Sequence, residues 1–150
     1  MNELDKAYLA GVVDSEGSIM LTNRSGLSVQ VQITQVNEPW LETLRAIFGK
    51  GRIIKVQNRN TEWSDKWVWY LAGKNAVELL QACLPYMKLK GAEAELVIEA
   101  YANCGSMGRN EKEETVRLIK MLKHSRRGLS VATEVPRITR STDQRRLFEF

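Results

Sequence analysis

Two carboxylates close the first apolar segment of the chain. In the stretch LAGVVDSEGS, residues 9–18, Asp14 and Glu16 follow apolar residues with helical spacing, and Gly17 can stop the helix. Acids at a helix C-terminus oppose the helix dipole, so their presence calls for a reason. Carboxylate oxygens suit Mg²⁺, which keeps waters and takes one or two carboxylates. The pair therefore indicates a divalent-cation site. The alternative is a core helix whose acidic end is only solvated.

Small residues in the same segment allow a second helix to approach. Ala10 and Gly11 lie beside larger apolar side chains, so two copies of this helix could pack closely side by side. Their acids would then meet at one end of the contact, where a bound cation would stabilise them.

Other metal and cofactor chemistry has few ligands available. Cys83, Cys104 and the single His124 cannot supply a four-ligand zinc site, and we interpret both thiols as free in a reducing compartment. The N-terminus has no basic region followed by an apolar run, and no segment holds about 18 consecutive apolar residues. We therefore expect no secretion, no membrane span and no small-molecule cofactor.

The remaining pattern predicts the elements that must position the two acids. Helical spacing or capping signals mark helices in residues 3–17, 37–49, 74–87, 91–105 and 110–124. Strand patterns mark residues 18–24, 26–36, 51–60 and 64–73. This order predicts an α+β fold with four antiparallel strands and helices on one face. We expect one domain over residues 1–128, with a basic C-terminal tail over residues 129–150.

The second expected strand alternates between an apolar face and a neutral polar face. Val29, Val31 and Ile33 share one face, while serine, glutamine and threonine side chains share the other. Such side chains can read base edges, although a plain solvent-exposed face is the alternative. The side chains that we assign to nucleic-acid contacts are Thr22, Arg24, Ser28, Gln30, Gln32, Thr34, Lys55, Gln57, Arg59, Lys66 and Tyr70.

Two features near this face have more than one interpretation. On the third strand Lys55, Gln57 and Arg59 alternate, but the apolar residues Ile54 and Val56 alternate as well. The pattern therefore leaves open which face of this strand meets the core, and Ile53 is one candidate for a core residue. The tryptophans Trp40, Trp67 and Trp69 are expected to pack in the core rather than stack on bases.

Positive charge is concentrated toward the C-terminus. From residue 117 onward nine basic and three acidic residues give +6, whereas residues 1–116 carry a net −2. This asymmetry suits a polyanionic partner, and a merely solubilising tail is the alternative.

Three stretches of the chain resemble one family. LAGVVDSEG, residues 9–17, resembles the motif of the LAGLIDADG homing endonucleases. LSVQVQITQ, residues 27–35, resembles the second strand of the single-motif chloroplast-intron enzymes, and LPYMKLKGAEAELV, residues 84–97, resembles a later segment of theirs. The resemblance covers about residues 4–100. It implies the αββαββα half-domain fold and site-specific cleavage of double-stranded DNA that promotes the mobility of an intron or intein. The alternatives are a DNA- or RNA-binding maturase or regulator of this fold without cleavage, and an unrelated α+β domain.

The resemblance also implies roles for individual residues. Glu16 would be the metal ligand, the Ser15 carbonyl would often add a ligand, Gln35 would hold water, and Lys90 would lie near the scissile phosphate. Mg²⁺ is the implied cofactor, Mn²⁺ is expected to substitute, and Ca²⁺ is expected to support binding only. The chain departs from the family in having Glu16 where Asp is commoner. It also lacks a basic residue before residue 40, where Glu and Pro stand.

The motif occurs once, which implies a homodimer. Two cuts need two sites, and a two-fold dimer reads a pseudo-palindrome of about 20 bp. The implied dimer contact is the motif helix, through Leu9, Ala10, Gly11, Val13 and Asp14. The expected location is inside a cell or organelle together with the host genome.

Overall fold

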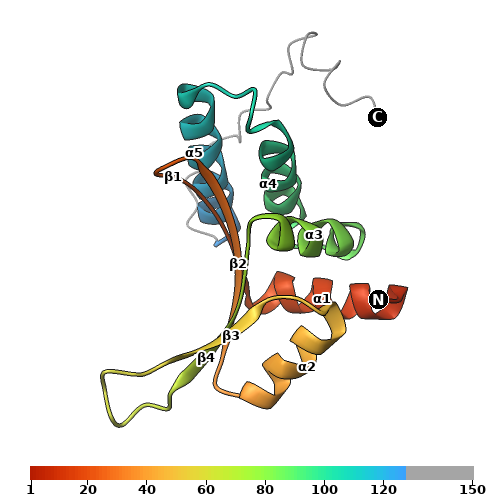
Figure 1. Ribbon diagram of the computed structural model, residues 1–150, viewed down its shortest axis with the longest axis vertical. Helices are drawn as coiled ribbons and strands as arrows, with labels where there is room; N and C mark the ends of the chain where they lie inside the picture. Colours follow the sequence, from red (N-terminus) through yellow and green to blue (C-terminus); the bar gives the residue numbers. More distant parts are fainter. Residues whose placement is uncertain (128–150) are drawn as a thin grey trace.

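A four-stranded antiparallel sheet organises the computed structural model, which describes residues 1–127 (Figure 1). Its spatial order is β1-β2-β4-β3, so the two hairpins meet where β2 pairs with β4. The strands are β1 (Gly17–Asn23), β2 (Leu27–Gln35), β3 (Arg52–Val56) and β4 (Lys66–Ala72). The expected tail over residues 129–150 lies outside the described residues.

The helices complete the predicted order. They are α1 (Glu3–Glu16), α2 (Glu38–Phe48), α3 (Gly73–Cys83), the short 3-10 helix η1 (Leu84–Tyr86), α4 (Gly91–Asn103) and α5 (Arg109–Arg126). In Figure 1, α1 to α4 lie on one side of the sheet, and α5 runs beside β1. The predicted α+β architecture with additional C-terminal helices is confirmed. No helix within residues 1–127 is long and apolar enough to cross a membrane.

Local sequence explains where the first helix begins and ends. Asn2 and Asp5 form a capping box at the start of α1, and α1 leads directly into β1 at Gly17. A Cβ at Gly17 would lie 2.7 Å from the Val13 carbonyl oxygen, so only glycine fits this sharp transition. The transition fixes Glu16 between the helix and the sheet.

The core lies between the helices and one face of the sheet. Alternation on β2 is confirmed, because Val29, Val31 and Ile33 are fully buried. Trp69 is also fully buried, and its Nε1 donates to the Lys50 carbonyl. The sheet therefore has one face committed to packing and one face with polar side chains.

Candidate active site and nucleic-acid interface

The end of α1 gathers the candidate catalytic residues. The side chain of Glu16 is exposed, and Gln35 Nε2 donates to its Oε2 at 3.2 Å. The pairing of Gly17 with Ile33 brings the end of β2 beside the end of α1 and so explains this contact. A carboxylate and an amide that are 19 residues apart in the sequence thus meet at the end of α1.

The second motif acid has a different role. Asp14 accepts hydrogen bonds from the backbone amides of Lys88, Leu89 and Lys90, at 2.6, 3.1 and 2.9 Å. Burial alone would raise the pKa of Asp14, but the three amide bonds together hold this pKa below its usual value. Asp14 thus fastens the start of α4 to α1, and Glu16 is the motif acid that remains exposed.

Lys90 is buried beside the same helix end, with 7% of its surface exposed. Its Nζ donates to the carbonyl oxygens of Val13 at 2.9 Å and Gly17 at 2.5 Å. An ammonium group at a helix C-terminus complements the helix dipole. Burial is the main reason that the pKa of Lys90 is lowered, and Arg126 adds to this effect. The residue implied to act near the phosphate therefore also stabilises the end of α1.

A charged cluster behind Lys90 was not foreseen from the sequence. Glu93 is 3% exposed and lies 3.1 Å from Arg126, while Lys123 Nζ donates to the Ile19 carbonyl. Burial raises the pKa of Glu93, and the neighbouring cations oppose this shift, Arg126 most strongly. These residues border a cleft of about 390 Å³ that also includes Asp14 and Ser15. The signal in the sequence was the placement of an acid one helical turn after Lys90.

The polar face of the sheet carries most of the expected nucleic-acid contacts. The strand pairing places Ser18, Gln32, Tyr70 and Arg52 in one row across all four strands. The Arg52 guanidinium lies 5.0 Å from the centre of the Tyr70 ring. The predicted side chains that the strand parity places on this face are Thr22, Ser28, Gln30, Gln32, Thr34, Lys66 and Tyr70. Arg24 lies in the exposed β1–β2 turn.

The structure settles the open parity of the third strand and shortens the strand from its expected extent. Lys55 is opposite Trp67 and so has the parity of the buried Trp69, and it pairs with Asp65 at 3.0 Å. β3 ends at residue 56, so Gln57 and Arg59 lie in the loop that follows rather than on the strand. Arg52 and Ser18, which were not predicted, lie on the polar face.

The expectations for the dimer contact are also corrected in part. Leu9, Ala10 and Val13 have no exposed surface, because they pack inside the subunit. Gly11 is exposed, and a Cβ built there meets no atom within 4 Å outside the adjoining turns of its own helix.

The exposed face of α1 is apolar along part of its length. It presents Leu4, Tyr8 and Gly11, with Leu4 81% and Tyr8 48% exposed. Trp40 Nε1 donates to the Tyr8 hydroxyl at 2.9 Å and fixes that side chain. A contact with a second copy would therefore use these residues instead of the buried ones.

Several solved structures are similar to this chain over most of its length. The homing endonuclease I-CvuI, solved with the I-CreI target in the presence of Mg, has a TM-score of 0.56 and 24% identity. That match covers 88% of this chain and 85% of I-CvuI. The archaeal intron-encoded homing endonuclease I-Vdi141I, solved with DNA, has a TM-score of 0.58 and 17% identity, with 88% and 87% covered.

The chain has the LAGLIDADG homing endonuclease fold. The LAGLIDADG endonuclease I-GzeII, solved with its DNA target, matches with a TM-score of 0.55 and 17% identity over 80% of this chain, but over only 44% of its own. The match thus covers less than half of the longer I-GzeII chain and most of the two shorter chains. No family model and no curated protein matches the sequence.

Proposed function

We propose that this chain of LAGLIDADG fold is a site-specific double-strand DNA homing endonuclease. It would act as a homodimer and would be located together with its host genome. The observation that carries the proposal is the division of the motif acids. Asp14 is held by three backbone amides, whereas Glu16 keeps an exposed carboxylate beside Gln35. Glu16 therefore remains available to bind a cation, whereas Asp14 is already committed to the backbone.

The donor set fits a divalent cation that is shared with DNA. Among residues 1–127 no group of three or more His, Cys, Asp or Glu side chains could enclose a metal ion. Mg²⁺ does not need such a group, because it usually binds one or two carboxylates, phosphate oxygens and waters. Glu16 and the Ser15 carbonyl would hold it. When bound, Mg²⁺ supplies positive charge at the reacting phosphate and lowers the pKa of water. Mn²⁺ is expected to substitute, and Ca²⁺ to support binding only.

The residues of the chain supply orientation and charge. The Gln35 amide fixes the Glu16 carboxylate and can also hydrogen-bond water. Lys90 uses two of its three N–H groups on the carbonyls that end α1, which leaves one donor for a phosphate oxygen. A preorganised ammonium group next to developing phosphate charge stabilises the transition state.

Substrate specificity would come from the polar sheet face. A two-stranded β-ribbon fits the major groove, where glutamine and arginine side chains distinguish base pairs. The row of Ser18, Gln32, Tyr70 and Arg52 offers these groups on adjacent strands. Two subunits related by a two-fold axis would read a pseudo-palindrome of about 20 bp.

Glu16→Gln tests the proposal directly. Wild-type protein with Mg²⁺ should cleave specific members of a randomised duplex library, and the variant should not cleave them. Because Glu16 is exposed, the variant should still fold and should bind the selected target in Ca²⁺ within about tenfold of wild type. Cleavage by the variant at the wild-type rate would remove Glu16 from the site. Specific binding by a wild type that never cleaves would instead favour the maturase or regulator alternative.

A further inference from the structure

The last helix runs antiparallel to the edge strand of the sheet. Two clefts lie between α5 and β1: residues 113–120 share the outer one with residues 21–24, and residues 123–127 share the inner one with residues 17–19. At ~1.5 Å per helical residue and ~3.3 Å per strand residue, both segments are about 20 Å long. Helix and strand therefore stay side by side from the β1–β2 turn to the end of α1.

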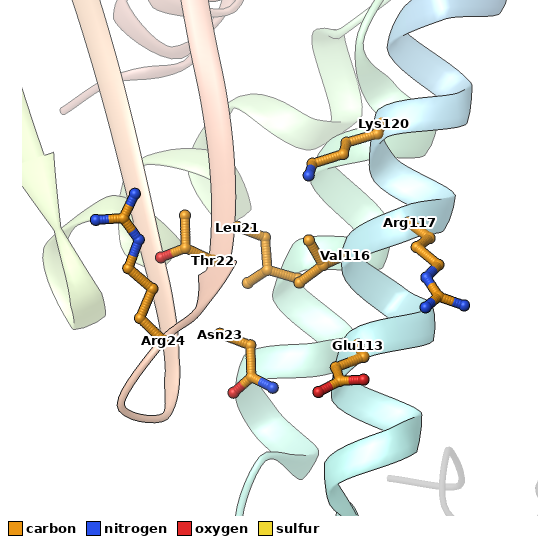
Figure 2. A pocket seen from close by; sticks show the side chains of 8 residues that line it. All are labelled: Leu21, Thr22, Asn23, Arg24, Glu113, Val116, Arg117 and Lys120. Atoms are coloured by element: carbon orange, nitrogen blue, oxygen red, sulfur yellow. The ribbon is translucent and has the colours of Figure 1, made fainter.

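The outer cleft has an apolar floor, and its basic residues lie at its borders: in Figure 2, Arg24 points outward from the β1–β2 turn and Arg117 points outward from α5. Leu21 and Val116 face each other between strand and helix, and Lys120 extends from α5 toward β1. The cleft measures about 370 Å³, and its lining holds three cationic side chains and one acid. Its charged residues are Arg24, Arg117, Lys120 and Glu113.

The basic residues of the outer cleft are available to a partner. Arg24, Arg117 and Lys120 are exposed, and none of the ion pairs between residues 1 and 127 engages them. Glu113, in contrast, is paired with Arg109 at 3.1 Å. The hydroxyl of Thr22 and the amide of Asn23 add neutral donors to the same cleft.

The positive charge continues into the inner cleft, where Lys123, Arg126 and Arg127 come from α5. Two of these side chains are already committed: Lys123 to the Ile19 carbonyl and Arg126 to Glu93. Arg127 is exposed. Uncommitted cations of α5 therefore lie at both ends of its contact with β1: Arg117 and Lys120 in the outer cleft, and Arg127 in the inner cleft beside the candidate cleavage site.

We propose that this face of α5, together with Arg24, is a phosphate track that holds one strand of the DNA backbone alongside β1. The proposal rests on the proposed function, since it assumes that the polar sheet face lies in the major groove. Any element in a groove is flanked by the phosphates of the two strands, and arginine, lysine, threonine and asparagine are common phosphate donors. A track of about 20 Å is long enough for several consecutive phosphates. It would set the position of the DNA without reading its sequence.

The salt dependence of DNA binding tests the track. The double variant R117Q/K120Q would be compared with wild type on a labelled duplex of about 30 bp in Ca²⁺, over about 50–200 mM salt. If both cations contact phosphates, the slope of log K against log salt should become shallower by about two. The loss should be similar for a specific and an arbitrary sequence.

A matched control removes the same amount of charge elsewhere. R45Q/K74Q changes two exposed cations of α2 and α3, which pair with Glu42 and Glu78. These helices lie on the face of the sheet opposite the polar face (Figure 1). This control should leave the slope close to that of wild type. A third variant, Glu113→Gln, removes the acid from the outer cleft and should strengthen binding at low salt.

The outcomes separate the two proposals. A wild type that binds duplex DNA with no salt dependence would overturn both. If wild type binds, but R117Q/K120Q has the slope of the control and Glu113→Gln has no effect, only the phosphate track is overturned.

Discussion

At the scale of single residues, two acids two positions apart have different structural environments. Asp14 is a structural anchor that accepts three backbone hydrogen bonds, and Glu16 is exposed. The sequence pattern predicted both acids at the helix end but treated them as a pair. What separates them is the return of the chain 74 residues later, where residues 88–90 pass over Asp14. A contact between residues so far apart in the sequence leaves no pattern in the residues around Asp14.

Replacing each acid by its amide should expose this difference in stability. Asp14→Asn should lower the free energy of unfolding by about 1–2 kcal/mol, because the acceptor loses its charge and one of its two accepting oxygens becomes an NH2 donor. Glu16→Gln should change it by less than about 0.5 kcal/mol, as is usual for an exposed site. Urea unfolding of both variants at neutral pH measures these quantities. Equal losses would contradict the assignment of Asp14 as the anchor.

The same residue gives a pH dependence with a defined sign. The folded-state pKa of Asp14 is lower than its usual value, so its stabilising contribution is complete above about pH 4 and disappears as the pH falls through the folded pKa. Wild type should therefore lose its advantage over Asp14→Asn on acidification. Urea midpoints measured from pH 7 to pH 3 check this, and a constant difference between the two proteins would argue against it.

At the scale of elements, β2 and β3 differ in how regularly apolar and polar residues alternate along the strand. β2 was predicted with its correct faces because Val29, Val31 and Ile33 alternate with polar residues. β3 has apolar residues of both parities, and its exposed Ile54 and Val56 contradict simple amphipathicity. Pairing with β4 resolves the ambiguity, since Ile53 lies opposite Trp69.

Substitutions on β3 should therefore differ in their effect on DNA binding. Arg52 lies in the polar row and Lys55 lies on the other face, paired with Asp65. Arg52→Gln should weaken binding to the selected target by about 1–3 kcal/mol, the range for one base contact. Lys55→Gln is the matched control on the same strand and should cost much less. Titrations of both variants under one salt condition decide, and the reverse order would mean that β3 faces DNA with the other parity.

At the scale of the whole molecule, α1 has apolar residues around most of its circumference. Leu9, Ala10 and Val13 fill the core, while Leu4 and Tyr8 remain exposed. The small residues of the motif and the family resemblance predicted an interface here but could not separate packing within a subunit from packing between subunits. An exposed apolar ridge that leads to Glu16 is nonetheless what two half-sites require, since such patches mark interaction surfaces.

Gly11 provides the sharpest test of assembly, because it lies on this ridge and has open space around it. Within one subunit, Gly11→Val meets no neighbouring atom, and valine has a slightly higher helix propensity than glycine, so the subunit should stay folded. Between two subunits, the added branched side chain would hold the helices apart. We therefore expect a folded monomer that neither dimerises nor cleaves. Gly11→Ala should have a smaller effect.

Sedimentation of wild type and variants, with and without duplex DNA, measures assembly. Ala102→Val adds similar bulk to an exposed position on α4 and should leave the oligomeric state unchanged. A wild type that remains a monomer at high concentration and on DNA would refute the homodimer. A Gly11→Val protein that still dimerises and cleaves would place the contact elsewhere than α1. Because the proposed dimer would bring two Glu16 carboxylates to one end of the paired helices, loss of assembly and loss of cleavage should occur together across the Gly, Ala and Val series.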